Sequence, residues 1–274
     1  MNPTFAADPA GRPVLDLRAV ARPPDLSDAP APSPEARAVA IRTWKGRMVN
    51  EHASAQVWAS LLPQAMRAAV PPALLVGLPA AASDELRHAE QCAGVVLALG
   101  GDARAPLPTL SPLPQHDDVG PLEGFLRNIL SVGCLSETVA VALIRAEHAE
   151  LTPGPLRELL GTILADEIQH ARLGWTALGL IAPKLDAAAK ARTQAYLAVA
   201  LAHQIEHELP LLPVVALPDD PALPQLGVCA GADARRLFFD CVEGAILPPL
   251  AGLGFDAAGA WAEARRRAAP LAAR

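Results

Sequence analysis

Aromatic residues are scarce in this chain of 274 residues: they make up 4% of it, and Tyr196 is its single tyrosine. Hydrophobic residues nevertheless account for 51% of the sequence. The core must therefore consist mainly of alanine, leucine and valine, which suits closely packed helices. The length allows one large domain or two small ones, with a real hydrophobic core.

Cysteine is also sparse, and its spacing excludes several kinds of site. The four cysteines are far apart and include no Cys-x-x-Cys pair (Cys92, Cys134, Cys229 and Cys241). This spacing excludes a rubredoxin-like or zinc-ribbon module. It is typical of a protein that works in a reducing compartment.

The chain has no excess of positive charge and no visible targeting signal. Its net charge of −6 disfavours a nucleic-acid partner, because affinity for phosphates depends on basic residues. No basic stretch followed by an apolar run stands near the N-terminus, so we expect no secretory signal. Charge interrupts every long apolar stretch within about eighteen residues, and we therefore expect no membrane-spanning helix. These absences predict a soluble, cytoplasmic protein without a membrane partner.

Two Glu-x-x-His pairs are the most informative feature that the sequence does contain. Each pair follows, by about thirty residues, one further glutamate on a helical pattern. In chain order the six residues are Glu51, Glu85, His88, Glu137, Glu167 and His170. A histidine three residues after a glutamate lies on the same helix face, so both can bind one metal ion. A four-helix bundle that projects all six groups inward has the ligand set of a two-iron or iron/manganese carboxylate site.

All four of these glutamates fall on apolar faces of predicted helices. Apolar positions recur at alternating steps of three and four residues through 41–62, 78–99, 126–144 and 156–181, with a glutamate inside each run. Burial of an unpaired ionised glutamate costs several kcal/mol. Four such faces need a shared compensating charge, which two divalent metal ions would supply. A single Glu-x-x-His is more often a solvated surface pair, and only the doubled pattern on core faces favours a metal site.

The residues around the two pairs carry a resemblance to a known superfamily. Residues 84–88 read Asp-Glu-Leu-Arg-His, and residues 166–170 read Asp-Glu-Ile-Gln-His. They resemble the doubled Asp-Glu-x-Arg-His motif of bacterial di-iron monooxygenases and ribonucleotide reductase small subunits, in the ferritin-like di-iron superfamily. The resemblance spans roughly residues 34–183 and implies metal roles for the six residues above. It would make Asp84 and Asp166 partners of the histidines, fixing their tautomers and ring orientation.

Departures from the motif narrow the activity that the resemblance implies. Gln169 stands where the second copy should have arginine. Cys92 occupies the place of the radical-forming tyrosine of reductase subunits, so we expect no tyrosyl radical. Ala140 and Val141 replace the threonine that monooxygenases tend to carry one turn after the third glutamate, while Thr138 lies on a different face. Cys92 could lie near the metals, but a small buried apolar residue is the simpler interpretation.

Proline and glycine divide the chain into parts. Residues 1–33, rich in proline and alanine, are expected to form an extended or disordered arm. Ser33, followed by Pro-Glu, should open the first helix, and Pro63 and Pro71-Pro72 should mark its end. The proline-rich residues 102–119 are the long crossover of a ferritin-like bundle. Residues 34–183 are thus expected to form an all-α, ferritin-like four-helix bundle.

Residues 184–274 exceed a minimal bundle. We expect additional C-terminal helices at about 186–209, 231–248 and 256–268, packed on the bundle. They would line a pocket or form the surface of a homodimer.

A second constellation lies in the first of these C-terminal helices. His203, Glu206 and His207 match His-x-x-Glu-His, the inverted zinc-peptidase motif, with Glu243 as a nominal further ligand. Zinc peptidases of that kind are normally much longer. Three interpretations stay open: a zinc site, extra ligands or pocket residues over the bundle, and a solvent-facing helix end. We favour the last.

The ligand set also limits the chemistry. Carboxylates and imidazoles in this ratio suit Fe(II), with Mn(II) as the main competitor. Small residues near the ligands leave room for a substrate pocket or, alternatively, let the helices approach closely (Ala55, Gly133, Ala140, Gly174 and Ala177). The chain contains no flavin or nicotinamide fingerprint, so a multi-turnover oxygenase would need a separate reductase.

Two functional hypotheses follow. The first is an oxidase or oxygenase that uses two iron ions and O₂ to act on a small organic substrate. The alternative is a di-metal protein that is not an oxygenase and serves iron storage, iron detoxification or peroxide reduction. The additional C-terminal helices and the lack of a rubredoxin-like module favour the first hypothesis.

Overall fold

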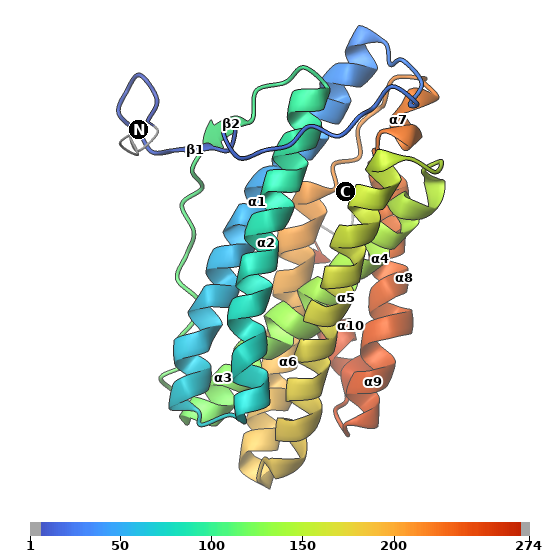
Figure 1. Cartoon of the computed structure of the whole chain (residues 1–274). Coiled ribbons are helices and arrows are strands. Elements are labelled where there is room, and N and C mark those ends of the chain that lie inside the picture. Colours follow the sequence, from blue (N-terminus) through green and yellow to red (C-terminus); the bar gives the residue numbers. More distant parts are fainter. Residues whose placement is uncertain (1–6, 270–274) are drawn as a thin grey trace.

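The computed structural model describes residues 7–269, and most of this range is helical (Figure 1). The long helices are α1 (Pro34–Arg67), α2 (Pro72–Ala98), α5 (Pro155–Ile181) and α6 (Ala187–Leu211). Between α2 and α5, one helical stretch consists of α3 (Pro121–Ile129), the π-helix η1 (Leu130–Ser136) and α4 (Glu137–Glu150). The shorter elements are η2 (Ala182–Lys184), α7 (Ala222–Gln225), α8 (Gly231–Cys241), the π-helix η3 (Val242–Ile246), α9 (Leu247–Gly252) and α10 (Ala257–Arg267). The prediction of an all-α fold is confirmed.

The start of α1 follows its sequence signal, and its end lies between the two proline signals. Ser33 is the N-cap, and its side chain accepts a 3.2 Å hydrogen bond from the backbone amide of Ala36. Helix α1 passes Pro63 and ends at Arg67, before Pro71 and Pro72. Pro63 is exposed, so water can bind the backbone carbonyl that the proline leaves without a donor.

Four helical segments surround the centre of the molecule. Helix α1 packs along α2, α5 packs against α2, and η1 and α4 pack against α5. The ring closes where α3 packs on α1. Buried side chains form two hydrophobic clusters, one around Trp58 and Leu130 and the other around Trp44, Met48 and Ile163. A layer of buried acidic and imidazole groups lies between the two clusters, where apolar packing would otherwise continue.

The C-terminal helices extend the first cluster. Helix α6 packs on α3 and η1, α8 packs on α4, and α10 packs on α6. Phe238, Leu250 and Trp261 bring buried side chains from these helices into the same core. Figure 1 shows α8 and α9 on the opposite side of the molecule from α1 and α2.

The N-terminal segment runs in an extended course over α2. Strand β1 (Val14–Asp16) pairs antiparallel with β2 (Arg104–Pro106), which lies in the crossover between α2 and α3. Farther on, the chain passes so close to Gly94 that a Cβ there would lie 2.3 Å from the carbonyl oxygen of Arg22. Only glycine allows this crossing. The sequence did not reveal the strand pair, because three-residue strands leave almost no periodicity.

The expectation that no helix is long and apolar enough to span a membrane is wrong. The stretch Pro121–Glu150 is long and apolar enough to cross a membrane, with a mean hydropathy of 1.7. Glu137 interrupts the stretch with a charge, but one or two charged residues do not make a helix of this length too polar to span a membrane. A helix in the core of a bundle can have the same length and composition, and Glu137 is buried beside other acidic side chains.

Candidate metal centre

The six predicted ligand residues meet in one place. Helix α1 contributes Glu51, α2 contributes Glu85 and His88, α4 contributes Glu137, and α5 contributes Glu167 and His170. They form two groups of four, and within each group the ligand atoms lie within 4.8 Å of one another. Glu85 and Glu167 belong to both groups. The buried cluster could therefore hold a metal ion in either group, and two of its carboxylates are common to both.

We call the two groups the His88 half and the His170 half. The His88 half adds Glu51 to the shared glutamates, and the His170 half adds Glu137. All members except Glu51 are buried, with at most 4% of the residue surface exposed. The side chain of Glu51 is 16% exposed.

The Nδ1 atoms of both histidines point toward carboxylates. Nδ1 of His88 lies 3.2 Å from Glu167 and 3.7 Å from Glu51. Nδ1 of His170 lies 3.3 Å from Glu167 and 3.4 Å from Glu85. Each imidazole thus presents one nitrogen to the oxygen atoms of its own half.

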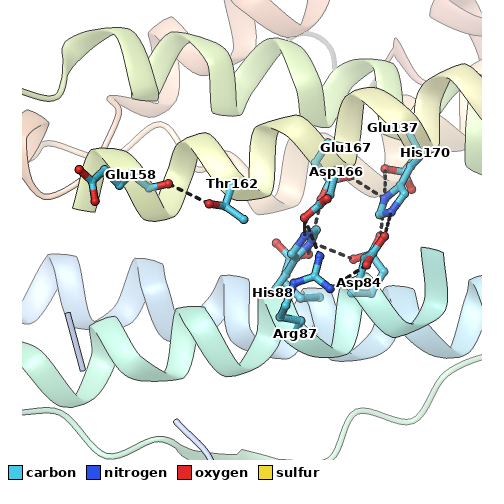
Figure 2. A network of polar contacts seen from close by, with 11 residues as sticks. Asp84, Arg87, His88, Glu137, Glu158, Thr162, Asp166, Glu167 and His170 are labelled. Carbon is cyan, nitrogen blue, oxygen red and sulfur yellow. Dashed lines mark hydrogen bonds and ion pairs between the residues drawn. The ribbon is translucent and has the colours of Figure 1, made fainter. Parts of the chain in front are cut away.

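The Nε2 atoms of the histidines contact aspartates in a crossed pattern (Figure 2). Nε2 of His88 lies 3.1 Å from Asp166, and Nε2 of His170 lies 3.3 Å from Asp84. Each aspartate therefore meets the histidine of the other helix. An acidic partner at Nε2 favours the proton on that nitrogen and leaves the Nδ1 lone pair for a metal ion. The contacts expected of the two aspartates are present, although the crossing was not anticipated.

A single arginine ties the two aspartates together. Arg87 donates to Asp84 over 2.8 Å and to Asp166 over 2.7 Å. Because one guanidinium serves both carboxylates, the second copy of the motif does not need its own arginine. Gln169 stands in that position and is exposed. The sequence showed that Arg87 matches the motif but not that it links α2 to α5.

Burial and crowding change the acidity of the glutamates. Burial raises the pKa of Glu85 to about 8, with the charges of Glu167 and Glu51 adding to the effect. Burial, and then the same kind of repulsion, raises the pKa of Glu137 well above its usual range. Burial would also raise the pKa of Glu167, but the adjacent imidazoles of His170 and His88 hold it well below its usual value.

The pKa values of both histidines are also raised, although burial acts on them in the opposite direction. Burial alone would lower the pKa of His88, but its carboxylate neighbours raise it to about 11. The pKa of His170 rises to about 10 for the same reason. Without a metal ion, protons thus balance the buried negative charge: the imidazoles are cationic and two glutamates are neutral. Divalent ions would replace these protons.

Trp58 distinguishes the His170 half. Its indole nitrogen donates a 3.0 Å hydrogen bond to Oε1 of Glu137, and its ring centroid lies 5.6 Å from that of His170. Oε2 of Glu137 is then the oxygen that faces the cluster. The π-helix η1 immediately precedes Glu137. The sequence placed Trp58 on the inner face of its helix but gave no sign of this contact.

The small residues do not mark a pocket where two of them meet. A Cβ built on Gly174 would lie 2.3 Å from the backbone of Gly133, so α5 and η1 touch there. The pocket hypothesis is wrong for this pair, and close helix approach is the correct interpretation. Two open depressions lie on the surface, one between α5 and α9 beside Trp175, the other beside β1 and His52.

The remaining candidates lie outside the cluster. Cys92 is buried in an apolar environment, which raises the pKa of its thiol well above the usual range. His203, Glu206 and His207 are exposed, as expected of a solvent-facing helix end. Glu243, the nominal further zinc ligand, instead accepts a 3.1 Å hydrogen bond from Trp261.

Among residues 7–269, the groups of three or more residues able to hold a metal ion are the two halves described above. Comparisons with protein-family models, curated proteins and solved structures find no match to this chain. A functional assignment therefore rests on the geometry of these two groups.

Proposed function

We propose that this chain is a ferritin-like di-metal protein that binds two iron ions, or one iron and one manganese ion. The observation that supports this proposal most directly is the sharing of Glu85 and Glu167 between two four-residue groups. Each ion would have one histidine, one glutamate of its own and the shared carboxylates. Oxygen and imidazole ligands in this ratio suit Fe(II) and Mn(II).

The side chains fit such ions in two further respects. Nδ1 of His88 is buried and has no hydrogen-bond partner among the described residues, although carboxylate oxygens surround it. A metal ion would satisfy this nitrogen. In addition, four ionised glutamates carry the negative charge that two divalent ions would balance.

We propose that the activity is that of an O₂-dependent oxidase or oxygenase acting on a small organic substrate. Two bound ferrous ions supply electrons to O₂. The protein would hold the imidazoles through Asp84, Asp166 and Arg87, and would hold Glu137 through Trp58. The two hydrophobic clusters exclude bulk water from the layer between them. A separate reductase would restore the ferrous state after turnover.

One observation favours the alternative hypothesis, a di-metal protein that serves iron storage, iron detoxification or peroxide reduction. The backbones at Gly133 and Gly174 touch, which removes one of the places where a substrate could lie beside the cluster. An oxygenase therefore needs its substrate to approach from another direction.

The decisive experiment is anaerobic loading with Fe(II), followed by metal analysis and rapid mixing with O₂. We expect two irons per chain, oxidation within seconds, and an optical transient whose decay accelerates with the correct substrate. Two irons that ignore O₂ would leave a metal-binding protein that is not an oxidase. Fewer than two irons would reject the di-metal centre itself.

A further inference from the structure

The helices around the centre leave one side less tightly closed. Helix α1 packs closely on α2 and on α3, whereas its approaches to α4 are few. In the described part of the chain, two side-chain hydrogen bonds join α1 to α4: Trp58 to Glu137 and Arg47 to Glu147. We call the stretch of the two helices between these links the α1–α4 gap, a term that refers to their backbones only. Glu51, the partly exposed ligand candidate, stands on α1 between them.

The link between Arg47 and Glu147 is only partly satisfied. Nη2 of Arg47 donates to Oε1 of Glu147 and, over 3.1 Å, to the carbonyl oxygen of Gly227. The guanidinium also lies 4.7 Å from the ring centroid of Trp44. Nη1 of Arg47 and Oε2 of Glu147, however, are buried and have no partner among the described residues. Charged atoms left in this state cost free energy, which a ligand that pairs with both would recover.

A second buried ion pair shows what a purely structural pair looks like in this molecule. At the other end of the bundle, both carboxylate oxygens of Glu123 accept hydrogen bonds, from Arg127 and Arg192. The carboxylate of Glu123 is therefore fully paired, in contrast to that of Glu147, although Nε of Arg127 is buried without a partner among the described residues. A pair that served only to tie α1 to α4 would gain from a carboxylate paired in the same way.

The position of the incomplete pair relates it to the metal centre. Arg47 precedes Glu51 by one helical turn on α1, about 6 Å along the axis. The two side chains retain 22% and 12% exposure for Arg47 and Glu147, so solvent reaches part of the pair. A small molecule held there would extend through the α1–α4 gap toward the His88 half, away from the closed contact at Gly133.

We propose that Arg47 and Glu147 bind the carboxylate and the ammonium group of a small zwitterion, an α-amino acid, whose side chain points toward the metal centre. On binding, the two residues exchange their mutual contact for contacts with the ligand, and Nη1 and Oε2 gain partners. A zwitterion brings no net charge into this largely buried place, whereas a simple carboxylate would face Glu147 and a simple amine would face Arg47. Binding of the amino acid does not require the proposed oxidase function. Only what happens to the bound ligand afterwards rests on that function.

The test is a thermal-shift screen of the full chain, as purified and again after metal loading, against each of the twenty proteinogenic amino acids at 10 mM. We expect at least one of them to raise Tm by about 5 °C. Its deaminated and decarboxylated analogues should each bind at least about 30-fold more weakly. Because binding is measured with and without metal, failure here is distinguishable from failure of the metal centre.

The variants Arg47→Met and Glu147→Gln should each weaken binding of that amino acid by about 30-fold or more, measured by calorimetry. Arg192→Met is the matched control: it removes a guanidinium paired with the buried Glu123 and should leave affinity unchanged. Circular dichroism checks that each variant is folded. The assignment is overturned if no amino acid shifts Tm, if a singly charged analogue binds as well as its parent, or if both variants retain full affinity.

Discussion

The two halves of the centre are built from the same residue types but differ in how firmly they are held. In the His170 half, Glu137 is 6% exposed and accepts a hydrogen bond from Trp58. In the His88 half, Glu51 is 16% exposed and accepts no side-chain hydrogen bond from the described residues. Repetition of a motif thus produces two halves that differ in exposure and in support from neighbouring side chains. The closed half suits a tightly held ion, and the open half suits exchange and access.

The difference comes from the helices that carry the two glutamates. Glu137 directly follows η1, whose backbone touches α5, and Trp58 covers it from α1. Glu51 lies on α1 between the two links to α4, and no comparable donor among the described residues reaches it. Because these neighbours come from distant parts of the chain, the spacing of the motif alone does not encode the asymmetry.

The largest effect should come from a residue that both halves share. Glu167→Ala removes one oxygen atom from each group and leaves the two Nδ1 atoms without their nearest carboxylate. We expect loss of both ions, measured as metal per chain after anaerobic Fe(II) loading and gel filtration. Glu90→Ala, on α2 but outside the cluster, is the control and should keep two irons. Retention of one tightly bound ion in Glu167→Ala would mean that the halves do not depend on a common bridge.

Much of this centre could be predicted from the sequence, and the reason is local. A glutamate and a histidine three residues apart share a helix face wherever the helix lies, so the six ligand candidates could be named before the fold was known. The crossed contacts of Asp84 and Asp166, and the role of Arg87 between them, depend on how α2 meets α5. Such contacts between helices leave no periodic signal.

The fold shows the same limit. Helix α1 starts where its cap predicts, whereas the π-helix η1 differs from an α-helix by about one extra residue per turn and is invisible to a period of three to four residues. The strand pair β1–β2 depends on two segments that are almost ninety residues apart. Small residues on an inner face were ambiguous for a similar reason, because only the partner helix decides whether they leave a space or fill it.

The second prediction concerns pH, which should affect both halves. At pH 7 the metal-free centre holds protons on both imidazoles, on Glu137 and on most molecules at Glu85, since the pKa values of His88, His170 and Glu85 are about 11, 10 and 8. Metal binding must release these protons. Affinity for Mn(II) should therefore keep rising with pH until the imidazoles lose their protons, and it should fall by more than about 100-fold between pH 8 and pH 6. Calorimetry in buffers of different ionisation enthalpy measures the release directly; binding without proton release would contradict it.

The third prediction tests whether the halves share their outer support. Arg87→Leu removes the donor that holds Asp84 and Asp166, and should therefore loosen both imidazoles together. Loss of such a partner typically lowers metal affinity about 10- to 100-fold. Competition with a chromophoric chelator measures both binding steps. Gln169→Arg is the matched control, because that exposed position already does without a contact to either aspartate, and its affinity should stay within about twofold. A loss confined to one step in Arg87→Leu would show that the guanidinium serves one half only.

The fourth prediction removes the feature that separates the halves. Trp58→Phe keeps an aromatic ring in the core but deletes the donor to Oε1 of Glu137. The buried oxygen then lacks its partner, which should cost about 1–3 kcal/mol of stability in the metal-free protein. Glu137 also becomes free to turn, so the ion of the His170 half should bind about tenfold more weakly and exchange at a rate closer to that of its neighbour.

Trp44→Phe is the control for this change. It deletes an indole hydrogen bond of 2.8 Å to the carbonyl oxygen of Leu226, in the other hydrophobic cluster and away from the ligands. Denaturant unfolding should show a loss in both variants, whereas metal exchange should change in Trp58→Phe alone. If the two ions still exchange at very different rates in Trp58→Phe, the asymmetry does not come from the indole. It must then arise from the α1–α4 gap, and Glu51 rather than Glu137 is the residue that sets the two halves apart.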